Sequence, residues 1–195
     1  MDKIPASDFP ISLQLDLATG LFETGPAKIE RRLSVMAPLF YDQEAVAEIA
    51  KQEDRLIYDM FHYYFDTSLS DMSTAVSRIQ AGKIGVEYFM TKGHFHALNN
   101  QPEIYFCLRG EGYLLLETRE GEFRAERWTP GTVTHIPAQW AHRVVNTGED
   151  TLFYISAFHK SAGHEYELIE QRGFSQVVIE RDGRPVFIPN PRRPE

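Results

Sequence analysis

Only one cysteine, Cys107, occurs among the 195 residues, so no disulfide can form within the chain. Secreted proteins often depend on disulfides, and the shortage of cysteine therefore suits a reducing compartment. Long hydrophobic runs are also missing, because the most apolar stretch, residues 152–158, is far shorter than the ~20 residues of a membrane-spanning helix. The first residues lack the cationic and then apolar pattern of a secretory signal. We therefore expect a cytoplasmic protein with no membrane partner.

Clusters of basic residues are absent as well, and 28 Asp and Glu residues outnumber 20 Lys and Arg residues, which gives a formal net charge of −8. Nucleic acids and anionic membrane surfaces bind proteins through many Lys or Arg side chains at phosphate spacing. We therefore expect neither partner, and any anionic ligand has to be held by a few local donors. Hydrophobic residues make up 43% and charged residues 25%, a globular composition that excludes an extensively disordered chain.

No linker, internal repeat or low-complexity segment divides the chain, so we expect one domain over residues 1–195. Residues 1–54 are predicted to form an N-terminal extension with one helix, which Asp42 caps and which packs outside a larger body. Residues 55–160 form the predicted core. Residues 161–195 are predicted to hold a helical turn at 164–171, a hairpin turning at Asp182-Gly183, and an exposed tail.

The core consists of short runs of aromatic and β-branched residues that are separated by glycine or proline. This pattern predicts an all-β fold. The predicted strands are 56–64, 74–80, 84–90, 103–108, 113–117, 123–128, 132–136, 142–146, 152–158, 174–180 and 185–188. So many short, closely spaced strands are typical of a sandwich or barrel, and a double-sheet jelly roll leaves few exposed edges.

Two histidines, His94 and His96, are separated by one residue, and alternate side chains of an extended strand point to the same face. Glu103 follows a polar connection that can return the chain antiparallel, and His142 can reach the same point from a neighbouring strand. Three imidazoles and one carboxylate suit Fe²⁺, Mn²⁺, Ni²⁺ or Zn²⁺. A histidine pair alone is more often a surface feature of a strand than a metal site, so the surrounding residues have to support this hypothesis.

The surroundings of these ligands resemble the paired metal-binding motifs of the cupin superfamily. Gly110 follows the first group of ligands, and Gly131, Pro137 and Asn146 surround His142. The cupin fold, a double-stranded β-helix or jelly-roll barrel, is what this resemblance implies. The chain departs from the common pattern in a longer spacing from His96 to Glu103 and in Tyr88 and Gln139, which stand where cupins usually have glycine. No departure removes a ligand.

A longer set of motifs resembles the cupin-type phosphoglucose isomerases, known chiefly from archaea and some bacteria. The motifs are Thr91-Lys92-Gly93-His94-Phe95-His96, Pro130-Gly131-Thr132-Val133, Trp140-Ala141-His142-Arg143 and Ala162-Gly163-His164-Glu165-Tyr166. The resemblance runs from about residue 15 to 191. It implies reversible interconversion of glucose 6-phosphate and fructose 6-phosphate in glycolysis and gluconeogenesis, a divalent metal and a homodimer. We expect Fe²⁺ ahead of Mn²⁺, Ni²⁺ or Zn²⁺.

An aldose–ketose isomerase moves a proton or a hydride between C1 and C2 of the sugar. Glu103 is the carboxylate nearest to the reacting carbons, so it could serve as the general base of an enediol route. A metal-bound carboxylate is a weakened base, and a hydride shift is the competing route; the residues do not decide between them. The resemblance implies that His164 positions the sugar or relays a proton for ring opening, and that Tyr166 binds a sugar hydroxyl.

The phosphate requires local donors, and three adjoin the metal histidines: the Thr91 hydroxyl, Lys92 and the N–H of Gly93. The resemblance places Thr91 and Gly93 in the phosphate site, together with Tyr58 and Ser77. Without it, Thr91 and Ser77 would be ordinary strand hydroxyls. Family members tend to have Thr at the position of Ser77 and Tyr at that of Phe158.

Tyr105 lies two residues after Glu103 and so shares its inward face, either as a site residue or as core packing. His62, His135 and His159 match no motif, and we interpret them as structural or surface residues.

Two other functions deserve comparison. An iron-dependent cupin oxygenase would use the same four ligands, but the phosphate donors at 91–93 and the lack of a cosubstrate motif argue against it. A non-catalytic sugar-binding cupin would tolerate the loss of ligands, whereas this chain keeps all four.

Overall fold

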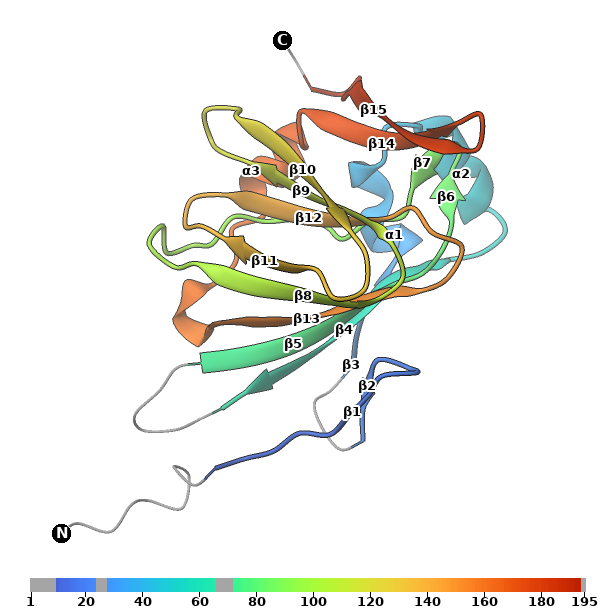
Figure 1. The fold of residues 1–195 in the computed structure, drawn as a ribbon. Helices are drawn as coiled ribbons and strands as arrows, with labels where there is room; N and C mark the ends of the chain where they lie inside the picture. Colours follow the sequence, from blue (N-terminus) through green and yellow to red (C-terminus); the bar gives the residue numbers. More distant parts are fainter. Residues whose placement is uncertain (1–9, 24–27, 66–71, 194–195) are drawn as a thin grey trace, which may run out of the picture.

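The computed structural model describes residues 10–23, 28–65 and 72–193. The first nine residues and the end of the predicted tail, residues 194 and 195, lie outside the described residues. The strands are antiparallel and form two layers that face each other (Figure 1). The all-β fold with a few short helices, predicted from the strand pattern, is confirmed. No helix of the described residues is long and apolar enough to cross a membrane.

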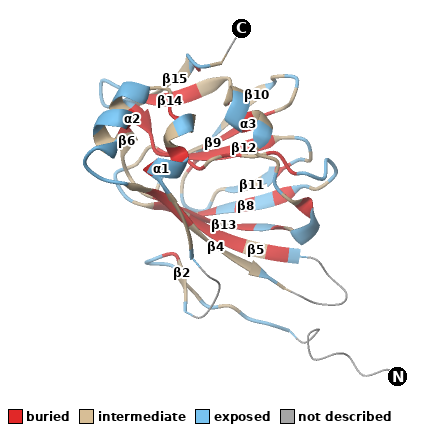
Figure 2. Cartoon of the chain, turned by 180° about the vertical axis from the view of Figure 1, so that it is seen from behind, coloured by how far each residue is buried: buried red, intermediate tan, exposed pale blue. Residues whose placement is uncertain are grey.

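One layer is a six-stranded sheet in the order β11-β8-β13-β5-β4-β3. Its strands are β11 (Val133–Ile136), β8 (Glu103–Arg109), β13 (Leu152–His159), β5 (Met72–Ile79), β4 (Leu56–Tyr64) and β3 (Lys28–Arg32). The facing layer contains a three-stranded sheet of β10 (Phe123–Trp128), β9 (Gly112–Glu117) and β12 (Ala141–Asn146). Strand β12 is buried along its whole length (Figure 2).

The facing layer continues through a four-stranded sheet in the order β15-β14-β7-β6. Its strands are β15 (Arg184–Pro189), β14 (Gln176–Arg181), β7 (Glu87–Tyr88) and β6 (Lys83–Ile84). The predicted hairpin between β14 and β15 is confirmed, and it turns through Asp182 and Gly183, which both have positive φ, 52° and 72°. That conformation is typical of the tight turns that connect twisted strands.

The single strand predicted at 84–90 is wrong, because the segment is divided between β6 and β7. Gly85 has φ +58° and interrupts the extended backbone. Beyond β7 the chain pairs with β12 instead: Asn146 N donates to the carbonyl of Phe89, and Thr91 N donates to that of Val144, both at 2.9 Å. This switch of partner carries the chain from the four-stranded sheet to the side of the three-stranded sheet.

The N-terminal segment contributes more to the fold than the predicted extension with one external helix. Helix α2 (Gln43–Ala50) is confirmed, and the Asp42 side chain caps it by accepting from Ala45 N at 2.9 Å. Strand β3, however, joins the six-stranded sheet beside β4, and α1 (Leu33–Met36) buries Leu33 and Met36 completely. A further two-stranded sheet consists of β1 (Leu15–Asp16) and β2 (Leu21–Phe22).

The remaining helices are short: the 3₁₀ segments η2 (Ala37–Leu39) and η3 (Lys160–Ala162), and α3 (Glu167–Arg172). The helical turn predicted at 164–171 therefore begins three residues later, so that His164 and Tyr166 precede the helix. Cys107 is buried, as expected of a small core residue, and burial raises the pKa of its thiol to about 11. A thiol with this pKa is a poor nucleophile.

Candidate active site

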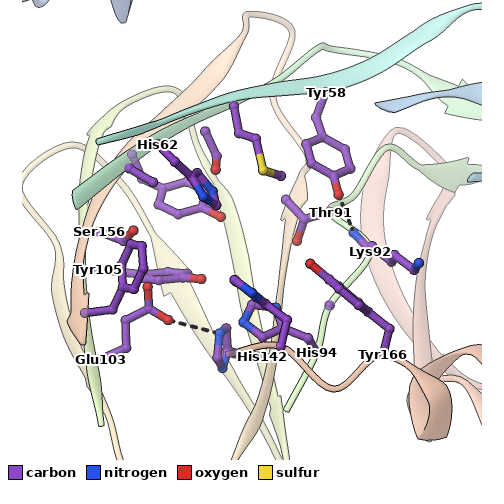
Figure 3. Close-up of a pocket in the computed structure, with 17 residues that line it drawn as sticks. Tyr58, His62, Thr91, Lys92, His94, Glu103, Tyr105, His142, Ser156 and Tyr166 are labelled. Atoms are coloured by element: carbon purple, nitrogen blue, oxygen red, sulfur yellow. Dashed lines mark hydrogen bonds and ion pairs between the residues drawn. The ribbon is translucent and has the colours of Figure 1, made fainter. Parts of the chain in front are cut away.

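A pocket opens between the two layers, and residues of both layers line it. Strands β4, β5, β8 and β13 supply one wall, and β12 with residues 91–94 supplies the opposite wall (Figure 3). The lining residues are Tyr58, Met60, His62, Ala75, Ser77, Thr91, Lys92, Gly93, His94, Glu103, Tyr105, His142, Tyr154, Ser156, Phe158, His164 and Tyr166.

One end of the pocket holds the predicted metal ligands. His94, His96, Glu103 and His142 offer ligand atoms that all lie within 4.8 Å of one another. Glu103 Oε2 is 3.2 Å from His96 Nε2 and 3.3 Å from His142 Nε2. The backbone fixes His94 beside His142, because each donates its N–H to the other's carbonyl, at 3.3 and 3.1 Å. The structure therefore brings together the four residues that the spacing predicted.

The Nδ1 atoms of His96 and His142 form hydrogen bonds outside the cluster, so that the Nε2 atoms of the same rings face the cluster. His96 Nδ1 donates to the carbonyl of Gln101 at 2.7 Å, and His142 Nδ1 donates to that of Trp140 at 3.2 Å. This arrangement leaves each Nε2 as the lone-pair nitrogen, as the outer hydrogen bonds of metal-bound histidines do. The Nε2 atoms of His94 and His142 are buried and have no hydrogen-bond partner among the described residues. A cation would satisfy them, so the donor set fits a metal ion.

The charges in the cluster agree with that fit. Burial alone would raise the pKa of Glu103, but its interactions with His142 and His96 outweigh burial and hold the pKa at about 2. Glu103 is therefore ionised. Burial, with the nearby rings of His142 and His164, holds the pKa of His94 well below its usual value. A neutral imidazole and an ionised carboxylate are the forms that bind metals.

His164 and Tyr166 lie over the cluster, in the segment between η3 and α3. Their rings stack at 5.7 Å with an angle of 4°, and the His164 ring is 4.4 Å from that of His94. Burial, followed by the effect of His62, lowers the pKa of His164 to about 4, so its imidazole is neutral near pH 7. Burial raises the pKa of Tyr166 to about 12, so its hydroxyl keeps its proton. Both side chains can donate a hydrogen bond into the pocket.

The other end of the pocket holds the predicted phosphate donors. Lys92 N donates to the hydroxyl of Tyr58 at 3.4 Å (Figure 3). Thr91 Oγ1 accepts from Val144 N at 3.0 Å, which leaves its own proton free to be donated. Gly93 has φ +75°, and a Cβ at this position would come within 2.8 Å of the Phe174 ring. Glycine is therefore required here by both conformation and space.

The ammonium group of Lys92 is engaged. It forms an ion pair with Glu170 of α3, and it lies 4.3 Å from the centroid of the Tyr166 ring. No local pattern indicates this pair, because Glu170 lies 78 positions further along the chain. A ligand that takes Lys92 as its partner has to displace a carboxylate.

The other two predicted pocket residues also line it. Ser77 is 7% exposed on β5. Tyr105 is buried, with its ring 5.4 Å from that of His142 and 4.6 Å from that of Tyr154. Tyr105 therefore both packs in the core and lines the pocket. Phe158, which stands where family members tend to have Tyr, also lines the pocket and offers no hydroxyl.

His62 is the residue that sequence reasoning misplaced. We interpreted it as structural or surface, but it lines the pocket, and its ring stacks on that of His164 at 6.2 Å and 23°. The alternation of β4 contained the signal, because Tyr58, Met60 and His62 share one face of the strand. Tyr154 and Ser156 of β13 line the pocket by the same rule and were also missed.

Comparison with solved structures gives only distant likenesses. An oxalate decarboxylase from Bacillus subtilis matches with a TM-score of 0.45 and 18% identity, over 55% of this chain and 26% of that chain. The Lactobacillus farciminis oxalate decarboxylase formate complex matches with a TM-score of 0.46 and 19% identity, over 56% and 30%. Overlaps this low say nothing about activity.

Comparison of sequences is far more informative. The chain is 39% identical over 183 residues to the glucose-6-phosphate isomerase of Pyrococcus horikoshii and 42% identical to that of Thermococcus kodakarensis, covering 94% of this chain and 96% of each relative. It is 32% identical to a putative glucose-6-phosphate isomerase 1 of Rhizobium meliloti, over 90% of this chain and 82% of that protein. Residues 30–190 match the family model described as glucose-6-phosphate isomerase (GPI). This chain therefore belongs to the cupin-type glucose-6-phosphate isomerase family.

Proposed function

We propose that this protein interconverts glucose 6-phosphate and fructose 6-phosphate with the help of a divalent metal held by His94, His96, Glu103 and His142. The observation that carries the proposal is one pocket with two different ends. One end gathers four metal-binding side chains, and the other offers the hydroxyl and backbone donors of residues 91–93. A sugar phosphate has matching ends, because its reacting oxygens and its phosphate lie at opposite ends of the molecule.

The metal we propose is Fe²⁺, with Mn²⁺, Ni²⁺ and Zn²⁺ as alternatives, since three imidazoles and a carboxylate suit all four. When bound, such a cation supplies a Lewis acid for the oxygens on C1 and C2 of the sugar. The chain contributes the fixed directions of the ligands, because the carbonyls of Gln101 and Trp140 hold the outer nitrogens of two of them.

His164 and Tyr166 act on the sugar. A neutral His164 imidazole can accept a proton at one nitrogen and donate one at the other, as opening of the sugar ring requires. Tyr166 keeps its proton near neutral pH and can donate a hydrogen bond to a sugar hydroxyl. Tyr105 borders the same space from β8 and restricts where the sugar can lie.

The phosphate binds at the opposite end. Thr91 donates its free hydroxyl proton, Gly93 offers a backbone N–H, and Lys92 offers a positive charge once Glu170 is displaced. Tyr58 and Ser77 add two further hydroxyls from β4 and β5. A few local donors suffice for one phosphate, which fits a chain with a net charge of −8.

The hydrogen on the substrate can move by two routes. In the first, Glu103 takes a proton from one carbon and returns it to the neighbouring carbon. A carboxylate whose pKa is held low and that also serves as a metal ligand is a weak base, which disfavours this route. The second route is a hydride shift from C2 to C1, accompanied by transfer of the O2 proton to O1; it takes no proton from carbon, and we propose it as the main route.

A coupled isomerase assay on purified protein tests the function, with glucose 6-phosphate and mannose 6-phosphate as substrates and metal analysis of the same sample. We expect turnover of glucose 6-phosphate, loss of activity with EDTA, and recovery with Fe²⁺ or Mn²⁺. His94→Ala and His142→Ala should lower the bound metal, whereas Glu126→Gln, a change of an exposed carboxylate on β10, serves as the control. Undiminished turnover after verified metal removal would refute the metal site.

We also propose that the protein is a single domain and a homodimer. Ile104 and Phe106 of β8 and Val133 of β11 support the dimer, because they are 47%, 38% and 62% exposed on the outer face of the six-stranded sheet. Light scattering of wild-type protein and of Phe106→Lys tests it: the wild type should have twice the chain mass, and the variant should dissociate. A monomeric wild type would refute it.

A further inference from the structure

The wall of the pocket next to β12 contains a β-bulge. Thr91 pairs with Val144, since Thr91 N donates to its carbonyl at 2.9 Å and Val144 N donates to Thr91 Oγ1 at 3.0 Å. The next pairing joins His94 to His142. Two residues of the loop therefore face a single residue of β12. An extra residue on one strand re-aims the backbone at that point, and such bulges are frequent beside active sites.

The single residue opposite the bulge is Arg143, whose side chain lies behind the pocket. Alternation along β12 directs it to the face opposite that of His142, and it is only 2% exposed. Its Nη2 donates to the carbonyl of Lys92 at 2.7 Å, and its guanidinium lies 4.7 Å from the centroid of the Phe174 ring. The Lys92 carbonyl is therefore held toward the buried side of the wall.

The orientation of this carbonyl decides the direction of the next N–H. The Lys92 carbonyl and the Gly93 N–H belong to the same planar peptide, and in a trans peptide the two groups point in opposite directions. With the carbonyl held by Arg143, the Gly93 N–H is directed toward the pocket that Gly93 lines. Among the described residues no protein acceptor receives it. It is a free donor beside the Thr91 hydroxyl.

Arg143 also brings a positive charge to this wall, and the nearby carboxyls of Glu87 and Glu117 act on it through space without an ion pair. Within the described part of the chain no carboxylate lies at ion-pair distance from it, and its Nε has no hydrogen-bond partner. The other cation of this wall, Lys92, is paired with Glu170. A charge in the protein interior acts over a longer distance than one in water, because the surroundings screen it less.

We propose that Arg143 is a positioning residue for phosphate recognition: it fixes the Lys92–Gly93 peptide so that the Gly93 N–H binds the phosphate, and its buried charge attracts that anion. The inference rests on the proposed function, because the phosphate is that of the hexose 6-phosphate. Arg143 touches neither substrate nor metal and acts only through the bulge and its charge.

Steady-state kinetics on metal-loaded protein test the proposal, with inorganic phosphate as a competitive inhibitor. Arg143→Met should raise both the KM for fructose 6-phosphate and the Ki for inorganic phosphate by roughly tenfold, as expected for one lost hydrogen bond to a charged group. The kcat and the metal content should change little. Arg143→Lys keeps a charge and a donor and should recover most of the loss. An unchanged Ki in folded, metal-loaded Arg143→Met overturns the proposal, and so does a fall in kcat at constant KM.

The matched control is Arg78→Met. Arg78 is also largely buried, and it binds Asp59 through two hydrogen bonds of 2.8 and 2.7 Å, away from the pocket. We expect this variant to lose thermal stability while KM and Ki stay at the wild-type values. An equal rise of Ki in Arg78→Met would show that any loss of a buried arginine weakens binding, and would overturn the specific role of Arg143.

A measurement on wild-type protein tests the Gly93 contact that the proposal requires, even if Arg143→Met fails to fold. In ¹⁵N-labelled protein loaded with diamagnetic Zn²⁺, titration with inorganic phosphate should shift the Gly93 amide resonance. A Gly93 resonance that stays in place at saturating phosphate overturns the inference. If the wild type isomerises its substrate and Gly93 does not respond, the inference fails together with the proposed phosphate role of Gly93, and the isomerase function stands. If Gly93 responds but no isomerase activity exists, the proposed function fails and the phosphate site stands.

Discussion

Glu87 offers a test of the electrostatics away from the metal ligands. It is 1% exposed on β7, Oε2 accepts from Tyr41 N at 2.8 Å, and Oε1 has no partner among the described residues. Burial raises the pKa of this carboxyl from 4.5 to about 7, and the nearby Arg143 and Arg192 oppose the rise only in part. The folded protein therefore holds a proton on Glu87 that the unfolded chain releases.

The sign of the effect follows from this raised pKa. Below pH 4.5 both states are protonated and Glu87 costs nothing. Between pH 4.5 and 7 only the folded state keeps this proton, so the free energy of unfolding falls by about 1.4 kcal/mol for each pH unit and by about 3 kcal/mol in total; above pH 7 the folded state carries a buried charge and the loss is complete. Between pH 5.5 and 8.5 about 2 kcal/mol of this loss takes place. Glu87→Gln removes the charge and keeps an acceptor for Tyr41 N.

Chemical denaturation at pH 5.5 and 8.5 measures the effect. We expect Glu87→Gln to gain about 2 kcal/mol over the wild type between the two pH values, with most of the gain at pH 8.5. Glu126→Gln removes one exposed acidic charge and should show no such gain. The same difference in unfolding free energy between Glu87→Gln and the wild type at both pH values would refute the reasoning.

Three further predictions concern the pocket. Thr91→Ala should raise the KM for the phosphorylated sugar by roughly tenfold with little change in kcat, since a hydrogen bond to a charged group is lost. Thr91→Ser keeps the hydroxyl and should restore the wild-type KM. An unchanged KM in Thr91→Ala contradicts the phosphate site. Glu170→Gln removes the ion-pair partner of Lys92 and should lower the KM for the phosphorylated sugar by up to about fivefold at low salt. That factor corresponds to the largest free energy that a half-exposed ion pair contributes. A rise in KM would show that the ion pair helps binding. Turnover in deuterated water should leave the product almost free of deuterium if the hydride shift dominates, whereas extensive incorporation measured by mass spectrometry would show that the proton-transfer route dominates.

Local patterns predicted much of the candidate metal cluster, and the resemblance to a known family supplied the expected reaction. Alternation places His94 and His96 on one face, and the polar connection to Glu103 returns the chain to the same point, so neighbours in sequence became neighbours in space. The strand boundaries of β4 and the cap of α2 by Asp42 follow from equally local rules.

The features that were missed depend on contacts between distant segments. Strand β3 joins the sheet because β4 offers it an edge, and a five-residue strand pattern alone does not indicate that partner. The pair of Lys92 with Glu170 and the hydrogen bond of Arg143 to Lys92 bring together residues far apart in the chain. His62 was missed for a different reason, because no motif includes it. The alternation of side chains along β4 would have placed it on the same face as Tyr58.

Strand β12 links the two ends of the pocket through a single peptide bond. His142 belongs to the candidate metal cluster, and Arg143, the next residue, holds the loop that contains the proposed phosphate donors. The span between the two ends is therefore set by covalent geometry and by the bulge, with no flexible segment to adjust it. We therefore expect sugar phosphates of a different chain length to bind less tightly, and a change of the preferred length to require a residue added to or removed from the bulge, which would shift the register of every residue beyond it.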